Sequence, residues 1–150
     1  MRILLLGDVC GPSGMEIIKL KLKKIIDEKK IDFTIANGEN AADNGKGITK
    51  NNFKELIESG VDVITSGNHI WDQKEILEII DKEKKLIRPA NLLEGQPGNG
   101  YGIYEIKNKK IAVINLIGNV FMKKSQDLFT FAEKIIKKIK LKKDADFIII

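Results

Sequence analysis

The chain has 150 residues, of which 43% are hydrophobic, and its formal net charge at pH 7 is +5. This length allows one domain with a sizeable core, and no apolar run approaches the roughly 18 residues that a membrane span needs. A single cysteine excludes an internal disulfide and fits a reducing compartment, so we expect a cytoplasmic protein with no membrane partner.

The first part of the chain alternates between strand and helix patterns. Residues 2–6 form an apolar run that ends at Gly7, which predicts a strand buried on both faces. A helix is predicted over about residues 14–30, with one apolar face formed by Ile18, Leu22 and Ile25. Residues 32–36 predict a second strand, and a polar, glycine-rich loop follows over residues 37–47.

The alternation continues beyond this loop. Thr49 is a suitable cap for a helix that ends at Ser59-Gly60, and residues 61–65 predict a third strand. Asp72, with Glu75 three residues later, predicts a capping box that opens a third helix. This β-α-β-α-β-α order is typical of a parallel sheet covered by helices, so the expected class is α/β.

The remaining residues predict a different arrangement. Residues 101–106 and 111–117 are β-like runs that flank Lys107-Asn108-Lys109-Lys110, which indicates a hairpin. A helix follows, with apolar residues at helical spacing: Leu128, Phe131, Ala132, Ile135 and Ile139. Residues 145–150 begin another buried strand. Because chain termini usually lie at the surface, this ending predicts a chain that is cut within a strand.

Positive charge is concentrated near the carboxyl end. Between Lys107 and Lys143 there are eleven lysines and only two acidic residues, Asp127 and Glu133. Such a segment can attract RNA or another phosphate-bearing ligand. No aromatic residue is interleaved among the lysines of residues 135–143, which favours a solvated helix face and leaves RNA as an alternative.

Polar side chains follow each of the three predicted parallel strands. They are Asp8, Glu39, Asn40, Asn68 and His69. Because ligands gather at the carboxyl ends of strands in open α/β sheets, we expect these side chains at one edge. Oxygen ligands with an imidazole nearby suit a hard or borderline divalent metal.

Each of these residues also has a structural alternative. Asp8 could cap the helix that follows, and Asn40 could hydrogen-bond within its own loop. His69, the only histidine, could be half-buried beside Trp71, and Cys10 is expected to be a small, partly buried residue rather than a ligand. Function is favoured because three successive strand ends carry such groups.

Four segments resemble a known family. "GDVCG", "NGENAA", "GNHIWD" and "RPANLLEGQPGNG" are similar, in order and spacing, to the blocks of the YmdB-type bacterial metallophosphoesterases, a branch of the calcineurin-like superfamily. Cys10 stands where the wider superfamily has the histidine of Asp-x-His, and Glu39-Asn40 replace aspartates of its second motif. The resemblance implies an α/β calcineurin-like layered sandwich (α/β/β/α) that is incomplete in this chain.

The resemblance also implies a site for two divalent transition-metal ions, iron or manganese. Asp8, Glu39 and Asn40 would hold one ion, Glu39 would bridge, and Asn68 would hold the second ion through its amide oxygen. His69 would be a catalytic acid or a phosphate-binding group. The implied reaction is hydrolysis of a small 2′,3′-cyclic nucleotide by a metal-bound hydroxide.

One departure from the family limits this expectation. The family completes its site with three histidines from later segments, D-x-H-A-E-like and G-T-H-x-H-like, and this chain has neither. We therefore expect residues 1–150 to be the amino-terminal portion of a single metallophosphoesterase domain, inactive alone. The alternatives are a non-catalytic nucleotide- or RNA-binding regulator that uses the same pocket, and a half-protein completed by a partner chain. The sequence leaves open a homo-oligomer.

Overall fold

The computed structural model describes residues 1–120 and 125–150, so two lysines of the basic segment, Lys123 and Lys124, lie outside the described residues. Its first sheet contains four parallel strands in the spatial order β1-β2-β3-β4. These strands are β1 (Ile3–Asp8), β2 (Phe33–Asn37), β3 (Val63–Thr65) and β4 (Leu86–Ile87). The predicted α/β class with a parallel sheet is confirmed.

Helices α1 (Gly11–Lys29) and α2 (Lys50–Glu58) connect the first three strands. The predicted Thr49 cap of α2 is confirmed, because its Oγ1 accepts a hydrogen bond from the backbone N–H of Asn52 (3.0 Å). One prediction about α1 is wrong: Ile25 is 38% exposed, and Ile26 packs against the core instead. Residues on one face of a helix are spaced by three or four positions, and here the core-facing residue after Leu22 comes four positions later, at Ile26.

The predicted third helix is not an α-helix. The structure has a five-residue 3-10 helix, η1 (Lys74–Glu78), without a side-chain cap. The two acidic residues of the predicted capping box contact other segments. The Asp72 carboxylate contacts His69, and Glu75 Oε1 accepts a hydrogen bond from the backbone N–H of Lys50 at the start of α2 (2.9 Å). The helix start therefore lacks the two groups that the prediction required.

Strand β1 is less buried than predicted. Leu4 and Leu6 pack on the helix side of the sheet, but Leu5 on the opposite face is 62% exposed. Among the described residues β1 is the end strand of its sheet, so it lacks a neighbour on one side. The expectation of a strand buried on both faces is wrong at this position.

The second sheet has the spatial order β5-β6-β7 and contains the predicted hairpin. Strands β5 (Tyr101–Ile106) and β6 (Lys109–Ile114) are antiparallel, and β7 (Phe147–Ile149) is parallel to β6. The turn is Lys107-Asn108 alone, and the predicted turn residues Lys109 and Lys110 belong to β6; the φ values of 50° and 61° are typical of a tight two-residue hairpin connection. The expectation of another buried strand over residues 145–150 is wrong, because β7 covers only Phe147–Ile149 and Phe147 is 42% exposed; Ile150, beyond the end of β7, lies on the surface.

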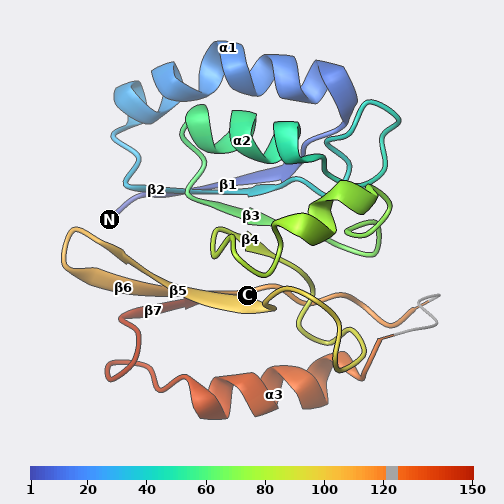
Figure 1. Cartoon of the computed structure of the whole chain (residues 1–150). Coiled ribbons are helices and arrows are strands. Elements are labelled where there is room, and N and C mark those ends of the chain that lie inside the picture. Colours follow the sequence, from blue (N-terminus) through green and yellow to red (C-terminus); the bar gives the residue numbers. More distant parts are fainter. Residues whose placement is uncertain (121–124) are drawn as a thin grey trace.

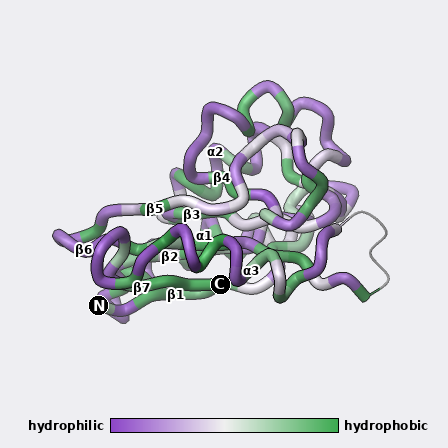
Figure 2. The backbone as a smooth tube through the Cα atoms, turned by 90° about the horizontal axis from the view of Figure 1, so that it is seen from below, coloured by the Kyte–Doolittle hydropathy of each residue, from purple (hydrophilic) through white to green (hydrophobic). Residues whose placement is uncertain are grey.

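Hydrophobic clusters hold these elements together in layers. α1 and α2 cover one face of the first sheet, the second sheet lies against its other face, and helix α3 (Leu128–Lys138) covers the outer face of the second sheet (Figure 1). Phe33 and Val63 of the first sheet pack against Ile111 and Val113 of the second. In Figure 2, the residues of β1, β2 and β7 are mostly hydrophobic and the tip of the β5–β6 hairpin is hydrophilic.

In the part of the chain that the structure describes, no helix is long and apolar enough to cross a lipid bilayer.

Candidate functional site

The carboxyl ends of the first three strands lie at one edge of the first sheet. Asp8, the last residue of β1, is in register with Asn37 at the end of β2, and Asn37 is in register with Thr65 at the end of β3. The loops that carry Glu39, Asn40, Asn68 and His69 therefore start from neighbouring positions. The expectation of a shared edge is confirmed for the backbone.

Asp8 and Asn40 are in direct contact. The amide nitrogen of Asn40 donates a hydrogen bond to Asp8 Oδ2 (2.7 Å), and the backbone N–H of Gly11 donates to the Asn40 carbonyl (2.8 Å). Asp8 does not cap α1, because the residue at that position is Cys10 and it forms no side-chain cap. The structural alternative for Asp8 is therefore wrong, and its carboxylate faces the loop after β2 instead.

Cys10 also contacts this carboxylate. Its Sγ lies 3.5 Å from Asp8 Oδ2, and the residue is exposed rather than partly buried as expected. Accepting a hydrogen bond from the thiol, and carrying negative charge beside it, the Asp8 carboxylate raises the pKa of the Cys10 thiol. The thiolate form that binds metals is thus disfavoured in this structure.

Glu39 links the loop after β2 to the loop after β3. Its backbone N–H donates to Asn37 Oδ1 (2.8 Å), and its Oε1 accepts a hydrogen bond from the backbone N–H of His69 (3.2 Å). The carboxylate lies so close to Gly67 that a Cβ there would be 2.1 Å from Glu39 Oε2. Only glycine at position 67 leaves room for this approach.

The His69 imidazole is held at the surface of the site. Its Nδ1 lies 2.6 Å from Asp72 Oδ2, and its side chain is 31% exposed. The following residue, Ile70, is fully buried in the core and anchors the segment. Among the described residues, His69 Nε2 has no hydrogen-bond partner, so this atom is available to a ligand.

Among the described residues, the side chain of Asn68 forms no hydrogen bond with the other candidate residues. It is exposed, and its side chain has no hydrogen-bond partner in the described part of the chain. Its position follows from the backbone alone, three residues after the end of β3. A role for Asn68 as a metal ligand stays a prediction.

The donor set fits a divalent ion in part. Asp8 and Glu39 offer carboxylates, and Asn40 and Asn68 offer amide oxygens, which are ligands suited to hard cations. Asn40 directs its amide nitrogen at Asp8, so its oxygen is the free atom. Within residues 1–120 and 125–150, no group of three or more His, Cys, Asp or Glu side chains could hold a metal ion. These residues alone supply an oxygen-rich, incomplete site.

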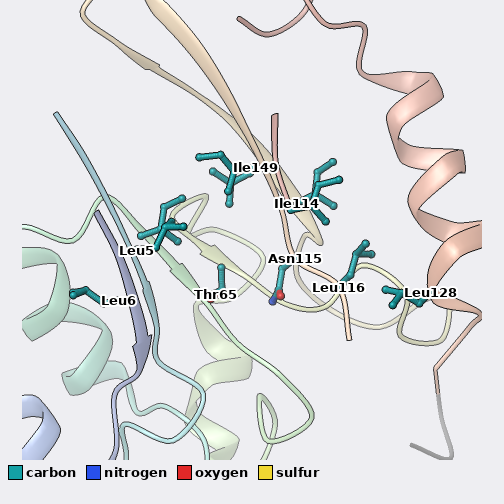
Figure 3. Close-up of a pocket in the computed structure, with 11 residues that line it drawn as sticks. Leu5, Leu6, Thr65, Ile114, Asn115, Leu116, Leu128 and Ile149 are labelled. Carbon is teal, nitrogen blue, oxygen red and sulfur yellow. The ribbon is translucent and has the colours of Figure 1, made fainter. Parts of the chain in front are cut away.

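Several hollows of the described residues lie near this edge, and two of them have mainly apolar linings. One, of about 530 Å³, lies between the end of β1 and α1, and its lining includes Asp8 and Cys10. The other, of about 300 Å³, lies between the two sheets, where Leu5 and Ile149 point into it beside Asn115 (Figure 3). None of the candidate site residues lines the second hollow, so it is separate from the polar site.

Sequence reasoning missed the structural role of the "RPAN" segment. The Arg88 guanidinium donates hydrogen bonds to three backbone carbonyls, those of Pro89 (2.8 Å), Pro97 (2.9 Å) and Gln96 (3.1 Å). Partial burial lowers the pKa of this guanidinium. The side chain thus ties the loop together. The available signal was that Arg88 is one of only two arginines beside 24 lysines.

Asn91 has a similar role and is fully buried. Its amide nitrogen donates to the carbonyls of Ile117 (2.8 Å) and Gln126 (3.0 Å), and its oxygen accepts from the Ile117 N–H (2.9 Å). It joins two chain segments that would otherwise leave partly buried backbone groups unsatisfied.

Comparisons with known proteins agree on one family. A family model described as YmdB-like protein matches residues 4–150. A curated relative, the 2′,3′-cyclic-nucleotide 2′-phosphodiesterase of Bacillus subtilis (strain 168), is 47% identical over 136 residues, which are 91% of this chain and 51% of that protein. The chain therefore spans about half the length of this relative.

Solved structures are also similar to this chain. A hypothetical protein from Thermus thermophilus matches with a TM-score of 0.90 and 35% identity, over 99% of this chain and 56% of that one. A novel phosphatase from Mycoplasma pneumoniae matches with a TM-score of 0.87 and 34% identity, over 98% and 53%. A 5′-nucleotidase precursor, also from Thermus thermophilus, shares the fold at 12% identity, with a TM-score of 0.59 over 91% and 34%.

Proposed function

Because the chain belongs to the YmdB-like protein family, we propose that it is part of a phosphodiesterase that hydrolyses 2′,3′-cyclic nucleotides. The name of the Bacillus subtilis relative supports this substrate class. The observation that carries the proposal is the pair of contacts that join three strand ends: Asn40 to Asp8 (2.7 Å), and the His69 backbone to Glu39 (3.2 Å). They bring two carboxylates and the backbone of the only histidine of the chain to one edge.

We place two divalent transition-metal ions, iron or manganese, at this edge. Asp8, Glu39 and Asn40 would hold one ion, Glu39 would bridge, and Asn68 would hold the other. When bound, such ions lower the pKa of a coordinated water and offset the charge of the phosphate. The two amide ligands keep the total charge of the site low enough for an anionic substrate, and imidazole ligands would come from residues outside 1–150.

We assign the imidazole of His69 to the leaving group. When the cyclic phosphate opens, a hydroxide oxygen forms a new bond to phosphorus, one phosphorus–oxygen ester bond breaks and a ribose oxygen acquires negative charge. A proton passed from Nε2 to this oxygen completes the hydroxyl group, so the Nε2–H bond breaks as the O–H bond forms. The ring is half-buried, with its side chain 31% exposed, and its Nε2 atom, which has no hydrogen-bond partner among the described residues, supports this role.

We propose that the complete domain is a calcineurin-like layered sandwich, of which residues 1–150 are the amino-terminal portion. The layer order of helices, sheet, sheet and helix supports this fold, as does the likeness to the 5′-nucleotidase precursor (Figure 1).

Two substitutions separate the proposed roles in the protein expressed from its complete gene. His69→Ala should leave both metals bound and lower kcat on 2′,3′-cyclic AMP by about 10²–10⁴-fold. A phosphodiester with a p-nitrophenolate leaving group needs little protonation, so the same substitution should be far less damaging there. Asn68→Ala should lower the occupancy of one metal and reduce activity on both substrates alike.

The outcomes distinguish the alternatives. If His69→Ala removes a metal, the imidazole is a ligand. If it lowers activity equally on both substrates, the ring positions the phosphate and transfers no proton. If the wild-type protein turns over neither substrate in the presence of Mn²⁺ or Fe²⁺, the assignment as a phosphodiesterase is wrong.

A further inference from the structure

We propose that Asp72 is a positioning residue that holds the His69 imidazole by its Nδ1 atom and leaves Nε2 directed at the substrate. The inference rests on the proposed role of His69 as the proton donor. The sequence had instead predicted that Asp72 caps the start of a helix. The contact between His69 Nδ1 and Asp72 Oδ2, at 2.6 Å, is the first observation behind it.

The backbone brings the two side chains together. The Asp72 N–H donates to the His69 carbonyl (3.0 Å), which closes a tight turn and returns the Asp72 carboxylate to the ring three residues before it. The preceding turn is closed in the same way, by the Ile70 N–H and the Gly67 carbonyl (3.3 Å). The geometry of the pair is thus set by main-chain hydrogen bonds.

Both sides of this turn are fixed to the rest of the protein. Ile70 is fully buried in the core. Gln73, directly after Asp72, donates from its amide nitrogen to the Lys46 carbonyl (2.7 Å) and to Asn44 Oδ1 (3.2 Å) in the loop after β2. Pairs of exposed charges usually contribute little, because two mobile side chains must be ordered. Here the backbone is already ordered on both sides, so less freedom is lost.

Asp72 has no other partner in the described part of the chain. It does not cap η1, which has Gln73 at its N-cap and no side-chain cap. No lysine or arginine among the described residues forms an ion pair with it, and its one such contact is His69. By contrast Glu75, the other half of the predicted capping box, binds the backbone of Lys50. Among the described residues, the Asp72 carboxylate therefore contacts only the His69 imidazole.

The contact with Asp72 determines which nitrogen of the His69 ring carries a hydrogen. A carboxylate accepts hydrogen bonds, so the atom that faces it, Nδ1, carries a hydrogen. In the doubly protonated ring, Nε2 is then the atom that gives up its proton to the ribose oxygen, and the ring becomes the neutral tautomer with hydrogen on Nδ1. Asp72 holds the ring orientation and that tautomer throughout, and takes up no proton itself. The Asp of serine protease triads acts on its histidine in the same way.

The tautomer can be read directly by nitrogen NMR of protein labelled with ¹⁵N-histidine. His69 is the only histidine in residues 1–150, so its signals are identified by their loss in His69→Ala. The sample is treated with a chelator, because paramagnetic ions broaden such signals. At a pH where the ring is neutral, the wild-type protein should show the tautomer with hydrogen on Nδ1. Asp72→Ala should lose this preference, and an unchanged tautomer in that variant overturns the proposal.

Kinetics supply the second arm, on the protein expressed from its complete gene. Asp72→Asn should lower kcat on 2′,3′-cyclic AMP by about 10–100-fold with little change in KM, because the amide can donate to Nδ1 and favour the wrong tautomer. Asp72→Glu, which keeps the carboxylate, should recover part of this loss. Glu78→Gln is the matched control: Glu78 is an exposed acid that pairs with Lys50 at 2.7 Å, and its loss should leave turnover unchanged.

A double substitution separates this inference from the function on which it rests. In a His69→Ala background, Asp72→Asn should cause no further loss of kcat, because the ring it positions is gone. A further loss of the same size shows that Asp72 acts elsewhere and overturns the proposal. If His69→Ala itself leaves turnover unchanged, the proposed role of His69 fails. The tautomer measurement then still decides whether Asp72 holds the ring.

Discussion

Replacing Gly67 by Ala should displace the Glu39 carboxylate from its place beside the loop after β3. The new Cβ would lie 2.1 Å from Oε2, 2.2 Å from Cδ and 2.3 Å from Oε1 of Glu39, and real Cβ atoms essentially never approach other atoms within 3.0 Å. The carboxylate must therefore retreat by roughly 1 Å or more, as in other overpacked sites. That movement breaks its hydrogen bond from the His69 N–H (3.2 Å).

The size of the effect follows from three contributions. A hydrogen bond to a charged group contributes about 1.5–3 kcal/mol, and overpacking costs about 1–3 kcal/mol where the neighbour cannot move freely. Replacing glycine by alanine also restricts the unfolded chain, which offsets about 0.4–1 kcal/mol. Because Glu39 is partly exposed and can swing aside, we expect a net loss of about 1–3 kcal/mol in the free energy of unfolding.

Urea denaturation measures this loss, and Gly118→Ala is the control. A Cβ at Gly118 would meet no atom within 4 Å, so that substitution should change stability by less than about 0.5 kcal/mol. Gly67→Ala should in addition weaken metal binding by the protein expressed from its complete gene, because Glu39 is a proposed ligand. Equal stability of the two variants, with metal binding intact, refutes the close approach of Glu39 to Gly67.

Three further predictions concern stability and metal binding. Asn91→Ala should lower the free energy of unfolding by about 1–3 kcal/mol, because it leaves partly buried backbone groups of Ile117 and Gln126 unsatisfied; an unchanged urea midpoint would contradict this. The Lys107 ammonium, and after it a backbone N–H, hold the pKa of the Asp32 carboxyl below its ordinary value of 3.8. The resulting stability is present above pH 3.8 and is lost as the pH falls through the folded-state pKa, so Asp32→Asn should flatten the acid side of a stability profile measured by urea titration. Residues 1–150 expressed alone should bind Mn²⁺ only weakly, since the described part offers no group of three His, Cys, Asp or Glu ligands, and tight binding of two ions after gel filtration would count against the assignment.

The parallel sheet could be predicted because its first three strands are apolar runs that end at glycine or polar residues. Strand β4 (Leu86–Ile87) could not, since two residues between charged neighbours show no periodicity. The prediction of a third α-helix was wrong for a different reason. The pattern Asp72-x-x-Glu75 favours a cap, but tertiary partners, His69 and Lys50, bind the two carboxylates instead. Local sequence does not reveal which partner a carboxylate finds.

The place of the candidate site could be predicted from the sequence, but the directions of its side chains could not. Parallel strands end at one edge, so residues after those ends could be placed together, and the contacts of Asp8 with Asn40 and of Glu39 with the His69 backbone agree with this. The direction of a side chain on an exposed loop does not follow from strand order, and Asn68 therefore stays a prediction.

The measurement that tests the central claim most directly is the turnover of 2′,3′-cyclic AMP by the protein expressed from its complete gene, before and after metal removal. Chelation should abolish turnover, and Mn²⁺ or Fe²⁺ should restore it in the wild-type protein but not in Glu39→Gln. Turnover that persists in the chelated protein, or that returns fully in Glu39→Gln, would contradict a phosphodiesterase site built on Asp8, Glu39 and Asn40.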